Sequence, residues 1–151
     1  MKIIFLDIDG VLNNPGCYAK ASGTMTPADP GCVAVLNHIV DETGALIVIS
    51  STWKLHGLIF CRERLLEWGV RAHKILDRTP NLQAKNKTRA EEIQRWLDDR
   101  ADHDSIESFV ILDDEANMGH LVHRLVKVAG YRGLIMPDAE LAIAMLSEAS
   151  A

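Results

Sequence analysis

The chain has 151 residues and a mass of 16.7 kDa, and a usual domain size of about 100 to 200 residues predicts one domain over 1–151. Hydrophobic residues make up 48% and charged residues 25%, a globular composition that excludes disordered and fibrous classes. No apolar run approaches the ~18 residues that span a bilayer, and Asp7 interrupts the N-terminal apolar stretch. We therefore expect a soluble, cytoplasmic protein with no membrane partner. Three cysteines without a CxxC spacing indicate reduced packing residues.

Charge is unevenly distributed along the chain. The 16 Lys and Arg against 21 Asp and Glu give a net charge of -5, which by itself argues against a nucleic-acid partner. From Arg71 to Arg89, however, six basic residues face one acidic residue, so this basic strip carries +5 and the remainder -10. Two interpretations stay open: a solvated loop that balances the acidic helix after it, or a surface that contacts phosphates.

The first third of the chain alternates between strand and helix patterns. The apolar run Lys2–Leu6 predicts a buried strand, and the turn formers after Asp9 open a loop or small flap over 13–30. Apolar residues at helical spacing predict a helix over Gly31–Thr43, which the next glycine ends. The β-prone run Ala45–Ile49 predicts a second strand.

The middle of the chain repeats this alternation. Helical spacing predicts a helix over Leu55–Trp68, and Val70–Leu76 predicts a strand. Thr88 is a candidate N-cap of a helix whose buried stripe is Ile93, Trp96 and Leu97, with Glu91 and Glu92 complementing the helix dipole.

The last third completes an α/β pattern. Phe109–Leu112 predicts a strand, Leu121–Val128 a short helix and a strand, Leu134–Met136 an extension of the sheet, and Ala139–Leu146 a final helix. Alternating strands and helices predict a three-layer, Rossmann-like α/β fold with a central parallel sheet.

Polar side chains follow three of the predicted strands. They are Asp7 and Asp9, Ser50 and Ser51, and Asp113 and Asp114. Ligands of such sheets bind at the carboxyl ends of the strands, so we expect these groups to converge. Crowded carboxylates repel one another unless a cation is present, and a set of oxygen ligands suits Mg²⁺. The sequence therefore predicts a magnesium site.

The same residues can carry phosphoryl transfer. An Asp carboxylate such as Asp7 can attack phosphorus, and Asp9 can protonate the leaving oxygen and later activate water. Gly10 leaves room for the turn that brings Asp9 to the site. The Ser50 hydroxyl and a cation from the basic strip, best Arg89, can stabilise the phosphoryl oxygens.

Four short segments resemble a known family. Phe5–Leu12, Ile47–Ser50, Arg89 and Ile111–Asp114 look like motifs one to four of the haloacid dehalogenase (HAD) superfamily of phosphohydrolases, in the right order. The fuller pattern of DIDGVLN, ISSTWK, RTP, RAEEIQRWL and ILDDE is similar to the small HAD domains associated with RNA-repair proteins.

The resemblance implies a role for each motif residue. Asp7 would be nucleophile and metal ligand, Asp9 general acid/base with its backbone carbonyl on Mg²⁺, and Ser50 a phosphate donor, with Ser51 beside it. Arg89 would hold the phosphate and the nucleophile. Asp113 would bind Mg²⁺, and Asp114 would bind a water of the metal or orient its neighbours. Motif three is mostly lysine in this superfamily, so Arg89 is a departure. We favour Arg89 and leave Lys87 as the alternative.

Two further signals have competing interpretations. His120 and His123 form an HxxH pair, which without a third ligand favours a solvated helix face over a metal site. Trp53 directly follows the second motif and either packs in the core or lines the site, where it could stack on a base.

The gaps between motifs bear on the substrate. They leave no room for a full cap domain, and by family analogy an open site favours large substrates such as nucleic-acid ends. The leading hypothesis is a Mg²⁺-dependent phosphomonoesterase that acts through an aspartyl-phosphate on a nucleic-acid terminal phosphate or nucleotide. The alternatives are a phosphatase of small metabolites and a weakly catalytic module that binds phosphorylated ends. A receiver domain is disfavoured because Ser50 stands where its phosphorylated Asp is expected, and dehalogenation because it needs no second acid such as Asp9.

Overall fold

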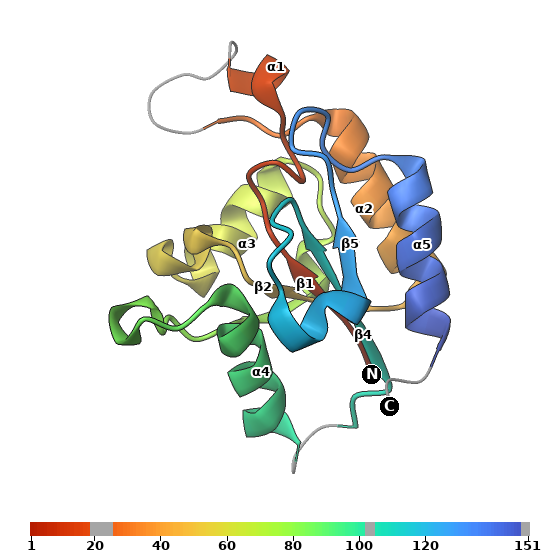
Figure 1. Cartoon of the computed structure of the whole chain (residues 1–151). Helices are drawn as coiled ribbons and strands as arrows, with labels where there is room; N and C mark the ends of the chain where they lie inside the picture. The colour runs from red at the N-terminus through yellow and green to blue at the C-terminus, as the bar shows by residue number, and fades with distance from the viewer. Residues whose placement is uncertain (19–25, 102–104, 149–151) are drawn as a thin grey trace.

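A central sheet of five strands organises the protein, which a computed structural model describes over residues 1–18, 26–101 and 105–148 (Figure 1). The strands are β1 Lys2–Leu6, β2 Leu46–Ile49, β3 Ile75–Arg78, β4 Ser108–Asp113 and β5 Leu125–Lys127. Their order is β3-β2-β1-β4-β5, and every neighbouring pair is parallel. The expected parallel sheet is confirmed, with β1 at its centre.

Alternation along β1 divides the core between the two faces of the sheet. Ile4 and Leu6 point to one face and join the cluster that contains the buried residues of α2, α3 and α5. Ile3 and Phe5 point to the other face, where the Phe5 ring meets the Trp96 ring edge to face at 5.4 Å. Both faces are therefore covered, as an all-parallel sheet requires.

The longer helices form the two outer layers of this sandwich, and they are α2 Pro30–Thr43, α3 Leu58–Glu67, α4 Arg89–Arg100 and α5 Met136–Ser147. The four-residue helix α1 Pro15–Tyr18 lies outside these layers (Figure 1). The 3₁₀ turns are η1 Thr52–His56, η2 Ala72–Lys74, η3 Gln83–Lys85 and η4 Gly119–Arg124. Figure 1 shows α2 and α5 side by side, while α4 packs on the opposite face together with η4. The expected three-layer architecture is confirmed.

Local sequence signals set the ends of two helices, and Gly44 and Thr88 act there as predicted. The Asp29 side chain caps α2 by accepting from Gly31 N, and Gly44 ends the helix with a φ of 70°. Thr88 caps α4 in a reciprocal capping box with Glu91.

Three predicted elements differ from the structure. The helix expected over Leu55–Trp68 is η1 followed by α3, because Gly57 breaks it with a φ of 95° and a ψ of 157°. The strand expected over Val70–Leu76 begins only at Ile75, which pairs with Ile47, because a 3₁₀ turn precedes it.

The third difference concerns the segment before the last helix. Leu134–Met136 does not extend the sheet: Leu134 N donates to Val11 O at 2.9 Å, and α5 already begins at Met136. Pro137 in the first turn fixes a helical φ, which explains why α5 starts earlier than its apolar pattern predicts.

Candidate active site

The polar residues that follow the strands lie along one edge of the sheet. Asp7 N donates to Leu112 O and Ser50 N to Leu6 O, both at 3.0 Å, so the strand pairing continues one residue past β1 and β2. Asp113 is the last residue of β4. Ser50, Asp7 and Asp113 therefore end three adjacent strands at their carboxyl edge, where ligands of open parallel sheets bind.

Three carboxylates form a compact acid cluster at this edge. Asp7, Asp113 and Asp114 each offer one oxygen, and these oxygens lie within 4.8 Å of one another. Asp7 and Asp113 are buried, whereas Asp114 is exposed. Such a group of oxygen atoms fits a hard divalent cation such as Mg²⁺. Proteins usually bind this ion through one or two carboxylates, and the ion keeps several water molecules.

Two glycines make room for Asp114 in the cluster. A Cβ on Gly10 would lie 2.4 Å from Asp114 Oδ2, and one on Gly130 would lie 3.0 Å from the same atom. Gly10 also has a φ of 84°, which side chains disfavour. Glycine is thus favoured at position 10 for two reasons. It adopts the backbone conformation of the turn after Asp9, and it lets the Asp114 side chain come close.

The carboxylates of the cluster are under electrostatic strain that a cation would relieve. Burial, followed by the charges of Asp113 and Asp114, raises the pKa of Asp7 from 3.8 to about 8, although Arg89 opposes the rise. Burial likewise raises the pKa of Asp113. A bound cation would favour the ionised forms and remove this cost.

Arg89 contacts the acid cluster from the first residue of α4. Its Nη1 donates to Asp113 Oδ2 at 2.7 Å and lies 3.5 Å from Asp7 Oδ1. Lys87, the alternative to Arg89, is exposed. Its charge helps to lower the pKa of Glu91, an exposed acid outside the cluster. Of these two residues, the structure brings Arg89 to the acids.

The two serines of the second motif have different surroundings. Ser51 Oγ accepts from Trp53 N at 3.2 Å and so caps η1. Ser50 Oγ is buried and has no hydrogen-bond partner among the described residues. A buried hydroxyl without a partner is costly, so a ligand atom that could bond to Ser50 would stabilise the site.

Asp9 is exposed at the mouth of the site, and donors hold both of its carboxylate oxygens. Asn13 Nδ2 donates to Oδ1 at 2.9 Å, and Trp53 Nε1 donates to Oδ2 at 3.1 Å. The Asn13 side-chain carbonyl in turn accepts from Gly10 N at 2.9 Å. Sequence reasoning missed both contacts, although Asn13 and Trp53 each belong to a motif that it had singled out.

Trp53 is a core residue rather than a surface for stacking. Only 8% of it is exposed, and its ring meets the Trp68 ring at 5.2 Å and the Phe60 ring at 6.3 Å. Of the two interpretations of this tryptophan, the structure therefore favours packing, with a polar edge that reaches Asp9.

A buried ion pair beside the site was also missed. Lys54 Nζ lies 2.7 Å from Glu92 Oε1 and 3.0 Å from Thr79 Oγ1, and both charged side chains are almost fully buried. Glu92 Oε2 accepts from Leu82 N at 2.8 Å. Its place in the first turn of α4 predicts that Glu92 complements the helix dipole, but Glu92 instead links α4 to η1.

The remaining sequence signals lie outside the acid cluster. His120 and His123 are exposed, and His120 Nε2 bonds to Gln94 Oε1 at 2.7 Å, as a solvated helix face predicts. The cysteines are buried free thiols, as expected, and burial raises the pKa of Cys32 to about 11.

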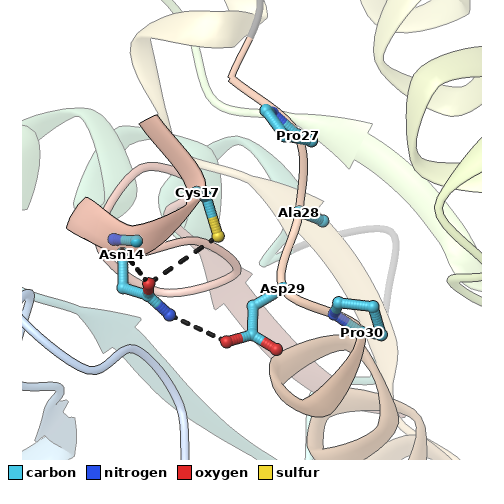
Figure 2. Close-up of a pocket in the computed structure, with 7 residues that line it drawn as sticks. Asn14, Cys17, Pro27, Ala28, Asp29 and Pro30 are labelled. Carbon is cyan, nitrogen blue, oxygen red and sulfur yellow. Dashed lines mark hydrogen bonds between the residues drawn. The ribbon is translucent and has the colours of Figure 1, made fainter. Parts of the chain in front are cut away.

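The segment that follows Asn13 borders a hollow of about 600 Å³ between α1 and the start of α2 (Figure 2). Asn14 Nδ2 donates to Asp29 Oδ2 at 2.8 Å across it, and Cys17 Sγ contacts Asn14 Oδ1 at 3.7 Å. Asp29 Oδ1 is already bonded to Gly31 N. The central part of the expected flap, 19–25, lies outside the described residues.

Two structural findings concern the lengths of the helices and the cover over the site. No described helix is long and apolar enough to cross a membrane. Within the described ranges, the chain between the second motif and Arg89 forms η1, α3, η2, β3 and η3, so no large cap covers the site from there.

Comparison with known proteins agrees with this geometry. Searches of curated proteins and of solved structures found no match. A family model described as the HAD domain in Swiss Army Knife RNA repair proteins matches residues 3–139, which include every residue of the acid cluster together with Asp9, Ser50 and Arg89. The chain therefore belongs to this family of HAD domains. The enzymes of the wider HAD superfamily are mostly phosphohydrolases.

Proposed function

We propose that the protein is a Mg²⁺-dependent phosphomonoesterase that forms an aspartyl-phosphate on Asp7 and acts on the terminal phosphate of a nucleic acid, within one HAD unit over 1–151. The observation that carries the proposal is the buried Ser50 hydroxyl without a described partner, on the strand next to Asp7. A phosphoryl oxygen is an acceptor that this hydroxyl could bond, while Arg89 supplies the opposite charge. Ser51 would have a smaller part than Ser50 in binding the phosphate, because its hydroxyl already caps η1.

The residues fit the two half-reactions of such an enzyme. An Asp7 oxygen attacks phosphorus while the bond to the leaving alcohol oxygen breaks, and Asp9 gives that oxygen a proton. In the second half Asp9 takes a proton from water, the water oxygen attacks phosphorus, and the bond to Asp7 breaks to release inorganic phosphate. Mg²⁺ held by Asp7, Asp113, Asp114 and the backbone carbonyl of Asp9 would neutralise charge on the phosphoryl oxygens.

A nucleic-acid end is the proposed substrate for two reasons. The described residues form no large cap, so a phosphate at the end of a long chain has room to reach the acids. Exposed cations of the basic strip, Arg78, Lys85 and Lys87, precede Arg89 and could contact neighbouring phosphates. The family's description as domains of RNA repair proteins supports an RNA end in particular.

Phosphate release tests the proposal. The panel contains oligonucleotides phosphorylated at the 2′, 3′ or 5′ position, mononucleotides and sugar phosphates, each with Mg²⁺ and with EDTA. Asp7→Asn should abolish release, whereas Asp41→Asn, which removes an exposed acid paired with Arg71, should not.

Each outcome of the panel decides between the alternatives. Release from one oligonucleotide end that needs both Mg²⁺ and Asp7 supports the proposal. Release from sugar phosphates alone would assign the protein to small metabolites. Tight binding of phosphorylated ends without release would make it a binding module.

A further inference from the structure

The 3₁₀ turn η1 follows directly from the two serines of the second motif and is held firmly in place. Lys54 N donates to Ser51 O at 3.0 Å, and the Ser51 hydroxyl caps the turn. Cys61 Sγ, from α3, bonds to Trp53 O at 3.3 Å. The consecutive side chains of Trp53 and Lys54 are both buried, and they reach different parts of the site.

Trp53 reaches the loop that carries Asp9. Its Nε1 donates to Asp9 Oδ2 while Asn13 Nδ2 donates to Oδ1, so two donors from separate segments fix the direction of one carboxylate. The indole cannot turn away freely, because Trp68 and Phe60 pack against it. An exposed carboxylate thereby acquires a defined orientation, which proton transfer to a bound substrate requires.

Lys54 reaches α4, the helix that begins with Arg89. It pairs with Glu92, which follows Arg89 by three residues and therefore lies on a neighbouring part of the same helix surface. Lys54 Nζ also donates to the hydroxyl of Thr79. The backbone N of Thr79 in turn donates to Ile49 O at the end of β2. The turn that follows Ser50 and the helix that begins with Arg89 are thus joined by buried polar contacts.

Burial of this ion pair points to a geometric role. Buried pairs pay a large desolvation cost, and apolar pairs of similar size are often as stable. A contribution to stability is therefore a weak reason for Lys54 and Glu92 to be charged, and their place between η1 and α4 favours a geometric role.

We propose that η1 is a positioning element for the phosphatase site: Trp53 orients Asp9, and Lys54, through Glu92, sets Arg89 against Ser50. This inference rests on the proposed function. It assigns the two residues no contact with the substrate, so both act through their partners.

The first test replaces Trp53 by phenylalanine, which keeps an aromatic ring and removes the donor to Asp9. A misdirected Asp9 should slow substrates whose leaving alcohol needs a proton, so kcat for an oligonucleotide phosphate should fall about tenfold or more. The first step with p-nitrophenyl phosphate, whose leaving group needs no proton, should change less than about twofold when it is followed as the burst of p-nitrophenolate. The burst isolates this step from the later attack of water, in which Asp9 acts as base. Trp96→Phe is the matched control, because it also replaces a buried tryptophan and removes an indole donor to a carboxylate, that of Asp77, on the other face of the sheet. Equal losses on both substrates, or the same selective loss in the control, would overturn the role of Trp53.

The second test removes the ion pair without leaving a buried charge, in Lys54→Met/Glu92→Gln. The inhibition constant of inorganic phosphate should rise about tenfold, equivalent to about 1.4 kcal/mol of binding, while Mg²⁺ affinity stays within about twofold. The control is Arg95→Gln/Asp99→Asn, which removes an exposed pair from the outer surface of α4. Unchanged phosphate binding, or equal losses of phosphate and Mg²⁺ binding, would overturn the role of Lys54.

These tests separate the inference from the proposed function. A wild-type protein that releases phosphate, with variants that behave like it, would refute the positioning role alone. A wild-type protein that neither releases nor binds phosphate would refute both.

Discussion

The carboxylate of Asp7 should control how the stability of the metal-free protein depends on pH. Its pKa is 3.8 in an ordinary environment and is raised to about 8 in the folded protein, by burial first and then by the neighbouring acids. The folded state consequently holds a proton that the unfolded chain has released at any pH between these values. Stability from this group is complete at low pH and is lost as the pH rises toward 8.

The size of the effect follows from the shift. Each pH unit in this window costs about 1.4 kcal/mol, so the free energy of unfolding should fall by about 4 kcal/mol between about pH 5 and about pH 8 through Asp7. Asp7→Asn carries an amide that does not ionise, and its stability should lack this component. Urea unfolding in EDTA, followed by tryptophan fluorescence at several pH values, measures the difference between the two proteins.

Mg²⁺ provides the complementary arm of this experiment. At a Mg²⁺ concentration one hundredfold above its dissociation constant, wild type should gain about 2.7 kcal/mol, and more at high pH because the cation competes with the proton. Asp7→Asn should gain less. Parallel stability curves for the two proteins from pH 5 to 8 would refute the reasoning, because they would show that Asp7 is not strained in the folded state.

Three further changes have defined outcomes. Gly130→Ala should weaken Mg²⁺ binding about tenfold in a calorimetric titration by displacing Asp114, whereas Gly31→Ala, on the first turn of α2, should not; equal affinities for Mg²⁺ would contradict this. Arg89→Lys replaces a planar donor with a single point charge and should raise KM for a phosphorylated substrate by about tenfold, with a smaller effect on Mg²⁺ affinity. Thr88→Ala removes the cap of α4 and should lower the free energy of unfolding by about 1 kcal/mol; an unchanged urea midpoint would show that the cap is dispensable.

Contacts close in the chain were readable from the sequence. β1 and β2 end just before the polar residue that stops an apolar run, and β4 ends on it. Thr88 caps its helix as predicted, although its reciprocal bond with Glu91 was not predicted. The parallel sheet then follows from the alternation of elements. Because the carboxyl ends of such a sheet meet at one edge, the neighbourhood of Asp7, Ser50 and Asp113 follows as well.

Contacts between distant residues were not readable in the same way. Glu92 reads as an acid in the first turn of a helix, and only its spacing of four residues from Trp96 hints that it faces inward. Its partner Lys54 is 38 residues away, and nothing local to either residue reveals the pair. The hydrogen bond from Trp53 to Asp9 joins residues 44 apart, and no local sequence pattern predicts it either. A glycine at position 57 is a possible helix end. The apolar pattern continues past it, however, and therefore favours one uninterrupted helix over Leu55–Trp68.

The central place of β1 also governs when the site can form. β1 pairs with β4 across more than a hundred residues, as in Ile3 with Phe109, and loop closure over such distances slows folding. During synthesis β1 leaves the ribosome long before its partner exists, and its apolar residues stay without their final contacts. Asp7 and Asp113 meet only when β4 has docked, so shortened chains that end before β4 should neither bind Mg²⁺ at this site nor stay soluble.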